Sequence, residues 1–470
     1  MKQLRPNKKW VLAAIGLLLV LLITKTVLFL AAKPKVKVDY VAEYNRTSRP
    51  QNYDPRQNAA PYYQKAFDAF VDVPDELRKY IKLKKPHVNW PVDFSDAEQA
   101  LLEKWLASNT MAFEYFREAS NKPYYWLERK ANTKNNINDI KTPDLACLRE
   151  FTEALTWDAK LKAVNDQFKA AFENILVCYK AGNQKCCSNL FLIEQYAGLH
   201  SKTSAIESAF VIIDRSQVDN IALKFLQDNM QVEIGNETYM PSIRAEKYFL
   251  YDALQRYFLD NGKGTGRLAF NVNLKYITLG GIWPNLKHKL HYCFKGPTRN
   301  DTEEQIKKVI ALSDKAMTKT PWQIQNEGNN YLVEIRKINK ANFFLETLGI
   351  NPVGIFFSYH KTRAQTNALI AVLAILRYKA DTDGFPESLD KLVSSGYLQN
   401  VPRDPYSNKS LVYKVTEDDF KLYSVGDNFK DDGGKDKLDD IYWPVQKQME
   451  ETFISKYKPQ EADSYSRYGL

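Results

Sequence analysis

The sequence has few of the residues that most often carry out catalysis or bind metal ions. Only five of its 470 residues are histidines and five are cysteines, and no two cysteines have Cys-x-x-Cys spacing. The Gly-x-Ser-x-Gly motif of α/β-hydrolases is also absent. Zinc clusters and serine or cysteine hydrolases therefore have no basis in the sequence. His288 and His291 have no carboxylate at metalloprotease spacing, so we interpret them as ordinary surface or core histidines.

The sequence also lacks a concentrated basic stretch, although its formal net charge is +10. Residues 381–445 contain 14 acidic and 8 basic residues, so the positive charge is carried by the rest of the chain. Proteins that bind nucleic acids usually gather their lysines and arginines on one face. We therefore expect no nucleic-acid partner, and we interpret the surplus lysines as solvated and membrane-flanking residues.

A long apolar run lies near the N-terminus. Residues 10–32, WVLAAIGLLLVLLITKTVLFLAA, are interrupted only by a Thr-Lys-Thr triplet, and about 20 apolar residues suffice to cross a bilayer. The end of the run matches a signal-peptidase site poorly, which favours a membrane anchor over a cleaved signal. Basic residues flank both ends almost equally, so the positive-inside rule favours neither orientation strongly. We expect residues 1–32 to form a cytoplasmic tip and a single-pass anchor in the cytoplasmic (inner) membrane, with the bulk of the chain outside the cytoplasm.

Two segments follow the anchor. Residues 33–57 are polar, contain proline and show no periodicity, so we expect a stalk or linker. Residues 58–350 have apolar residues at helical spacing and no repeat of fixed period. They predict an irregular all-α extracytoplasmic body.

The clearest helix is predicted over residues 142–182. Thr142 is a good N-cap, and Gly182 is typical of the residue just past a helix C-terminus. Cys178 lies near this end and Cys186 follows the expected turn, so a disulfide between them is feasible in an oxidising compartment. Buried free thiols are an equally open alternative, because cysteine is among the most buried residue types.

The last part of the chain combines one long helix with short strands. Residues 361–380 have a helical apolar pattern, which the sequence DTDGF ends. A short helix, a loop with two prolines and the alternating strands LVYKV and FKLYSV follow. We predict a small α+β module with a short antiparallel sheet over residues 351–445 and a polar tail over residues 446–470. The fold class expected for the whole chain is mainly α.

The ordered series RYKADTDGFPESLDKLV, YLQNVPRDPYSNKSLVYK, DFKLYSVGDNFKDDGG and DDIYW, within residues 361–443, resembles the C-terminal half of the major pseudopilin of type II secretion systems. The resemblance implies the pseudopilin-like fold of this module. It does not imply polymerisation, because no leader-peptidase motif and no long apolar helical half precede the segment. A module embedded in this way is also similar to those in large envelope proteins of Planctomycetes and related bacteria, and an anchor followed by a helical body fits that group best.

Six aspartates lie within fourteen residues of the loop after the second predicted strand. In major pseudopilins the corresponding loop binds calcium, so the resemblance implies a calcium cofactor here, with Asp427, Asp431, Asp432 and Asp440 as ligands. Calcium prefers about six to eight oxygen ligands, and crowded carboxylates repel one another unless a cation separates them. The alternative is a solvated acidic loop in which interspersed lysines dilute the repulsion.

Together these patterns predict a membrane-anchored envelope protein with a structural or protein-interaction role related to secretion or surface assembly. Its expected partners are the lipid bilayer, through residues 10–32, and other envelope proteins or further copies of itself. We expect no enzymatic activity. The rival hypothesis is an extracytoplasmic enzyme with a cleft in the helical body, built from scattered carboxylates such as Glu150, Glu153 and Glu246. Carboxylates that converge in a pocket would favour the enzyme, whereas an exposed apolar patch would favour binding.

Overall fold

The structure is a computed structural model of the chain, and it describes residues 8–78, 94–131, 135–186, 190–235, 240–272, 286–328, 330–435 and 440–445. Within these ranges the fold is mainly helical, with a three-stranded antiparallel sheet near the C-terminus. This confirms the mainly α fold class with a short antiparallel sheet. The N-terminal end of the expected cytoplasmic tip, before residue 8, and the polar tail over residues 446–470 lie outside the described residues.

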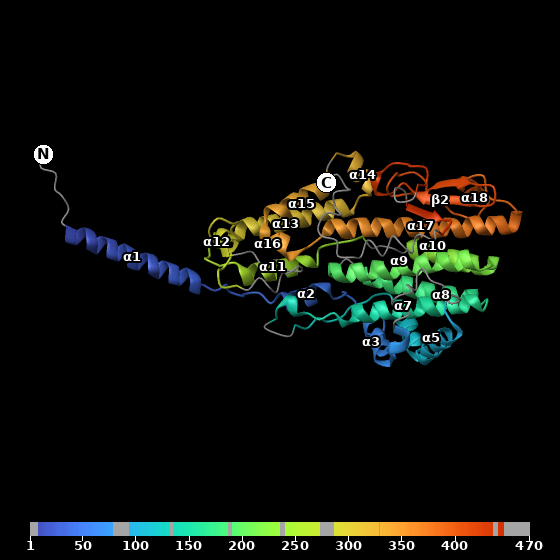
Figure 1. Cartoon of the computed structure of the whole chain (residues 1–470), viewed down its shortest axis with the longest axis horizontal. Coiled ribbons are helices and arrows are strands. Elements are labelled where there is room, and N and C mark those ends of the chain that lie inside the picture. The colour runs from blue at the N-terminus through green and yellow to red at the C-terminus, as the bar shows by residue number, and fades with distance from the viewer. Residues whose placement is uncertain are drawn as a thin grey trace.

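One helix extends away from the rest of the molecule. α1 (Lys8–Ala31) is long and apolar enough to cross a membrane or to be a signal sequence, and its most apolar stretch is not buried (Figure 1). The residues over Trp10–Ala31 are apolar around the whole circumference of the helix, whereas a surface helix of a globular protein has one polar face.

The segment after α1 belongs to the folded body. The backbone N–H groups of Lys37 and Val38 both donate to the side-chain oxygen of Gln255, at 3.0 and 3.1 Å. The Gln255 amide donates back to the carbonyl of Val38 at 2.8 Å. α2 (Tyr40–Ser48) follows and buries one of its faces. The structure thus corrects the expectation of a stalk over residues 33–57. This polar segment is hydrogen-bonded to the body, and such contacts leave no periodic pattern in the sequence.

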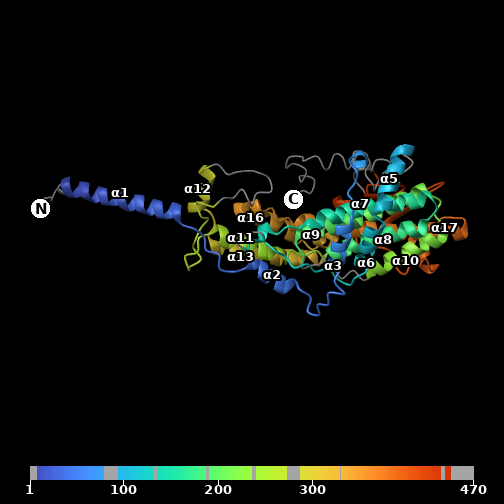
Figure 2. The same cartoon turned by 90° about the horizontal axis from the view of Figure 1, so that it is seen from below.

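Long helices of the body lie side by side along the long axis of the molecule, and shorter helices pack around them (Figures 1 and 2). In chain order they are α3 (Ala60–Ala69), α5 (Asp96–Ser108), α6 (Thr110–Ser120), the 3-10 helix η2 (Ile137–Asp139), α7 (Pro143–Val164), α8 (Phe168–Lys185), α9 (Leu192–Arg215), α10 (Asn220–Gly235), α11 (Glu246–Tyr257), α12 (Leu286–Phe294), α13 (Arg299–Met317), α14 (Pro321–Asn326), α15 (Tyr331–Ala341) and α16 (Phe343–Leu348). α9 is the central helix of the stack and is buried on nearly every side.

The single helix predicted over residues 142–182 is in fact two helices, α7 and α8. Between them Asp166 has a φ of 56°, a backbone conformation that interrupts an α-helix. The apolar pattern runs through the break because both helices bury a face in the same core. Gly182 does not end α8, which continues to Lys185; it lies where α8 crosses α9.

α17 (Pro352–Thr382) has 31 residues and runs beside α9 and α10 (Figure 1). Its residues 364–375 belong to the same hydrophobic core as buried residues of α3 to α10. The module predicted over residues 351–445 is therefore not separate from the body predicted over residues 58–350. The two share one core.

The small sheet packs on α17 through its second and third strands. After α18 (Leu389–Ser394) come β1 (Val412–Val415), β2 (Phe420–Ser424), the 3-10 helix η4 (Gly426–Asn428) and β3 (Asp440–Trp443), and the strand order is β1-β2-β3. β1 and β2 pair in regular antiparallel register, whereas the pairing of β2 with β3 is irregular between Leu422 and Tyr423. This confirms the predicted order of long helix, short helix, loop and antiparallel strands. The likeness to a pseudopilin remains a prediction.

Candidate functional site

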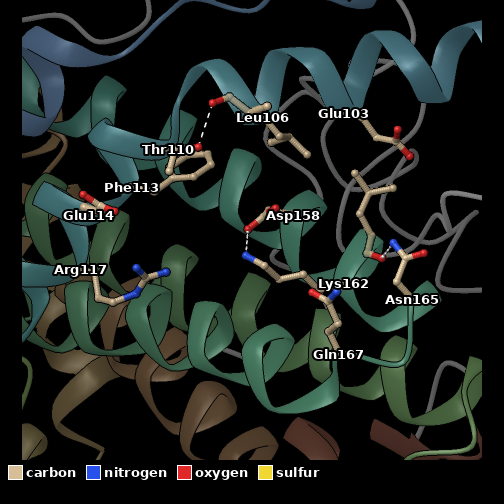
Figure 3. Close-up of a pocket in the computed structure, with 12 residues that line it drawn as sticks. Glu103, Leu106, Thr110, Phe113, Glu114, Arg117, Asp158, Lys162, Asn165 and Gln167 are labelled. Carbon is tan, nitrogen blue, oxygen red and sulfur yellow. Dashed lines mark hydrogen bonds and ion pairs between the residues drawn. The ribbon is translucent and has the colours of Figure 1, made fainter.

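An open pocket of about 450 Å³ lies between α5 and α6 on one side and α7 on the other (Figure 3). Its volume is in the range of sites for small molecules. The residues that line it are Glu103, Leu106, Ala107, Thr110, Phe113, Glu114, Arg117, Asp158, Leu161, Lys162, Asn165 and Gln167. Histidine, cysteine and serine are not among these lining residues, whereas carboxylates, a lysine and a threonine are.

Charged groups of this pocket are already paired with other side chains. Asp158 accepts hydrogen bonds from Lys162 and, at 2.6 Å, from the side-chain amide of Asn174. Arg117 Nη2 donates to the oxygen of Asn174 at 3.1 Å, so these side chains form a chain of contacts across α6, α7 and α8. The Nε atom of Arg117 is buried without a hydrogen-bond partner. The arrangement could bind a polar or anionic group beside Arg117.

A second group of charged side chains lies inside the body, where α7, α8 and α9 meet the extended segment before them. Arg129 pairs with Glu194 and lies 3.5 Å from Asp144, and Lys185 Nζ lies 2.6 Å from Asp144 Oδ2. The hydroxyl of Tyr125 donates to the same oxygen at 2.8 Å. We call Arg129, Asp144, Lys185 and Glu194 the buried ion cluster, because none of these side chains is more than 7% exposed. Two positive and two negative charges leave the cluster neutral.

Electrostatics in the buried ion cluster follow from burial and pairing. Burial alone would raise the pKa of Asp144, but Lys185 and Arg129 outweigh it and lower this pKa to about 2. Burial lowers the pKa of Lys185 and raises that of Glu194, while the opposite charges offset part of each shift. Buried charges of this kind are tolerated only when each has a partner. The cluster does not line the pocket, so its role is to join segments of the body.

The carboxylates predicted for an enzyme do not line a common pocket. Glu246, in the first turn of α11, is buried near Glu194 and accepts a hydrogen bond from the backbone N–H of Leu192 at 2.7 Å. Burial raises the pKa of Glu246 to about 7. Glu150 and Glu153 are half-buried on α7, and none of the three expected residues lines the pocket of Figure 3.

Two aspartates predicted as calcium ligands are bound to protein donors. Asp431 accepts hydrogen bonds from the hydroxyl of Tyr423 at 2.8 Å and from the backbone N–H of Gly433 at 2.9 Å. These donors lower the pKa of Asp431, with the backbone N–H of Gly433 as the main cause. Asp432 accepts from the side-chain amide of Asn428 at 2.7 Å.

The other two predicted ligands lie near a lysine of α17. Lys361 Nζ is 3.3 Å from Asp440, and the negative charge of Asp440 is the main cause of the raised pKa of Lys361; burial opposes this shift, and Asp427 adds a smaller contribution in the same direction. Among the described residues, no three histidine, cysteine or acidic side chains are arranged to hold a metal ion. The described residues alone therefore do not make a calcium site. Asp436 and Asp439 of the same loop lie outside the described residues.

Asp404, in the loop with two prolines, is a buried carboxylate that sequence reasoning missed. Its oxygens accept hydrogen bonds from the backbone N–H groups of Tyr406 and Val425 and from the hydroxyls of Ser407 and Ser424. Burial raises the pKa of Asp404 although these four donors favour its charged form. The sequence signal that could have indicated this role was an aspartate followed directly by a proline, with a serine three residues after the aspartate, as in a turn. Asp404 fastens this loop to β2.

Cys178 and Cys186 are both buried, and no disulfide joins one to the other. Because α8 continues between them, they are about 12 Å apart along one helix. A disulfide needs Cα atoms within about 7 Å, so this geometry does not allow a bridge between these two cysteines, which was one of the two alternatives that the sequence left open. The expectation depended on a helix that ended at Gly182. Cys187 lies outside the described residues.

No protein-family model matches this chain, and no curated protein or solved structure matches it either.

Proposed function

We propose that the chain is a single-pass protein of the cell envelope, anchored in the cytoplasmic membrane by α1, with its folded body outside the cytoplasm. The observation that carries this proposal is the attachment of α1. The ring of Phe29, in the last turn of α1, stacks on Phe294 of α12 at 4.6 Å, and the segment after α1 is hydrogen-bonded to Gln255 of α11. A helix that the body holds in this way fits a retained anchor better than a signal sequence that is removed.

In this proposal the body has a structural or protein-binding role. The outer face of α10 carries Ile221 and Val232, which are 82% and 57% exposed. They are eleven residues apart, so they lie on nearly the same side of the helix. Two large apolar side chains exposed on one face, with the half-exposed Lys224–Asp228 ion pair between them, fit a contact with another envelope protein or with a second copy of the chain.

Membrane fractionation of the full chain tests the anchorage. We expect the wild-type chain to stay with the membrane after an alkaline carbonate wash and to be cut in its body by protease added to spheroplasts. A Leu18→Arg and Leu22→Arg double variant should be released, because each central charge costs about 3 kcal/mol on insertion. An Ile221→Arg variant is the matched control and should remain bound. A wild-type chain that washes off, or a mature chain without residues 1–32, contradicts the proposal.

The size of the detergent-extracted protein tests the binding role. We expect the wild-type chain to elute as a complex and an Ile221→Asp variant to elute as a smaller species, because a charge at this position opposes apolar contact. Met111→Asp is the control, since Met111 is 62% exposed on a different helix, α6. Equal elution of all three proteins would exclude the α10 face as the contact.

Calcium binding in the acidic loop is a separate proposal, supported by the pseudopilin resemblance. It requires ligands beyond the described aspartates, with Asp436 and Asp439 as the nearest candidates in the sequence. Calorimetric titration of calcium into the purified full chain tests it. Saturable heat that disappears in an Asp432→Ala and Asp440→Ala double variant supports calcium. If the folded, metal-free protein gives no binding heat with calcium, the calcium proposal is wrong. Lys361 is then the cation that balances the charge of Asp440.

An extracytoplasmic enzyme is the second candidate function, and the pocket of Figure 3 is the observation that favours it. Its substrate would carry a polar or anionic group that binds beside Arg117. We expect a binding ligand to raise the melting temperature of the wild-type chain and not of an Arg117→Met variant. Turnover of such a ligand by the wild-type chain would favour the enzyme, and binding without turnover would favour the structural role.

A further inference from the structure

The contact between α1 and α12 fixes where α12 lies relative to a membrane. The apolar stretch Trp10–Ala31 has 22 residues, and at about 1.5 Å per residue it spans about 33 Å, close to the thickness of a hydrocarbon layer. Phe29 is two residues before the end of α1, so it lies near the edge of that layer when α1 crosses it. The ring of Phe294 stacks on Phe29 with a centroid distance of 4.6 Å and must lie at the same depth.

Phe294 is nevertheless 58% exposed, and Leu290, about one turn earlier in α12, is 37% exposed. The views of Figures 1 and 2 agree that α12 lies at the end of the body nearest α1, beside the point where α1 ends. Apolar side chains that are exposed at the edge of the hydrocarbon layer contact lipid and not water.

Exposed basic residues follow the ends of both α1 and α12 in the sequence. Lys33 and Lys35 directly follow α1, and Lys295 directly follows Phe294; all three are exposed. The next lysine, Lys37, is already fixed to the body by an ion pair with Asp260 at 2.5 Å. The five residues between α1 and Lys37 can span at most about 20 Å, so this end of the body stays close to the membrane surface.

We propose that the C-terminal turn of α12 is a second membrane contact, which inserts Leu290 and Phe294 into the headgroup boundary while Lys33, Lys35 and Lys295 bind anionic lipid headgroups. Apolar side chains at the acyl boundary with lysines at the headgroups are the arrangement that holds interfacial segments on anionic membranes. The inference rests on the anchorage of α1 proposed above. It adds that the body lies against the bilayer at a fixed angle.

Photo-crosslinking of the full chain in lipid vesicles tests the contact. Phe294→p-benzoylphenylalanine is compared with the same replacement at Leu19, in the middle of α1, and at Ile221, which is exposed far from α12. Vesicles of phosphatidylcholine, with or without phosphatidylglycerol, provide the lipid, and mass spectrometry measures the lipid adduct. We expect adducts at positions 19 and 294 and at least tenfold less adduct at position 221.

Separate outcomes distinguish the two proposals. An adduct at position 19 without one at position 294 overturns the second contact and leaves the anchorage intact, whereas no adduct at position 19 overturns the anchorage itself. A Lys33→Glu and Lys295→Glu double variant, carrying the crosslinker at position 294, should lose at least half of its adduct in anionic vesicles and little in neutral ones. An unchanged yield in anionic vesicles overturns the headgroup contact.

Discussion

The carboxylate of Asp144 connects side chains from three segments of the chain. It accepts a hydrogen bond from Tyr125 and pairs with Arg129 and Lys185, all of them in the interior. Oδ1 faces Arg129, whereas Oδ2 is shared by Lys185 and Tyr125, so removing the charge of this carboxylate affects contacts between all of these segments.

We expect Asp144→Asn to lower the free energy of unfolding by about 3–5 kcal/mol, because it leaves buried positive charge without a full partner. Urea unfolding of the full chain in detergent measures the change. Asp228→Asn is the control, since its ion pair with Lys224 is about half exposed and contributes about 0.5 kcal/mol or less. Equal losses in both variants would show that the buried ion cluster contributes no more than a surface pair.

Glu246 makes stability depend on pH. Burial raises its pKa from 4.5 to about 7, so the folded chain keeps a proton that the unfolded chain releases between these values. Stability therefore falls as the pH rises through this window, by about 3 kcal/mol in total. Glu246→Gln keeps an acceptor for the N–H of Leu192 and removes the titration.

Urea unfolding from about pH 5 to pH 8 tests this sign. We expect the wild-type chain to lose stability relative to Glu246→Gln as the pH rises, and the difference to become constant above about pH 8. Asp144 adds no slope in this range, because its pKa of about 2 places its loss of stability at much lower pH. A difference that does not change between pH 5 and pH 8 contradicts the role of Glu246.

Burial of single residues was easier to predict than their partners. The apolar positions of α7 and α8, such as Leu148 and Phe172, are in the core as their spacing predicted. The pairing of Arg129 with Glu194, and the meeting of Arg117 with Asp158 at one pocket, join residues far apart in the sequence. Spacing in one sequence gives no information about such contacts, so neither the buried ion cluster nor the pocket was foreseen.

At the scale of the elements, the presence of a helix was easier to predict than the residues at which it begins and ends. α10 was missed, although Asp219 caps its first turn by accepting from the N–H of Ala222 at 2.8 Å and its buried residues have helical spacing. The break between α7 and α8 was missed because the apolar pattern continues across Asp166. The spacing of apolar residues shows which face of a helix is buried. A turn between two helices that share one core changes this spacing little.

The crossing of α8 and α9 depends on two glycines. A Cβ atom on Gly182 would lie 2.6 Å from the carbonyl oxygen of Gly198, and a Cβ atom on Gly198 would lie 2.6 Å from that of Gly182. We expect Gly182→Ala to lower the free energy of unfolding by about 1–3 kcal/mol, since the helices must move apart. Thermal unfolding measures the change.

Gly235→Ala is the matched control for this substitution. Gly235 ends α10, and a Cβ atom there would have no neighbour within 4 Å. This change should be neutral or stabilise the chain by up to about 1 kcal/mol, because alanine loses less backbone entropy on folding. A Gly182→Ala variant as stable as the control would show that the two helices separate at little cost.

For the whole molecule, the shared core is the property that the sequence did not indicate. The apolar face of residues 364–375 was predicted to be buried, but their partners were expected within a module over residues 351–445. They pack instead against helices of the body, and α17 is flanked by α9 and α10. Periodicity does not identify the surface that covers a helix.

We expect residues 1–350 alone to unfold without a cooperative transition and to be digested rapidly, because the surfaces of α9 and α10 that α17 covers would be exposed. Limited proteolysis and thermal melts measure this. Co-expression of residues 351–470 as a second chain should restore a cooperative melt. A two-state transition of residues 1–350 by themselves would show that the body folds independently.

The position of α17 late in the sequence also determines when the hydrophobic core can be completed during synthesis. About 130 residues separate the end of α10 from the buried stretch of α17, and at about 5–20 residues per second a ribosome needs roughly ten seconds to make them. Throughout that interval the surfaces of α9 and α10 that α17 covers in the folded chain have no partner from this later segment. In the proposed extracytoplasmic topology, export would create a brief binding site for chaperones, and the arrival of α17 would close it.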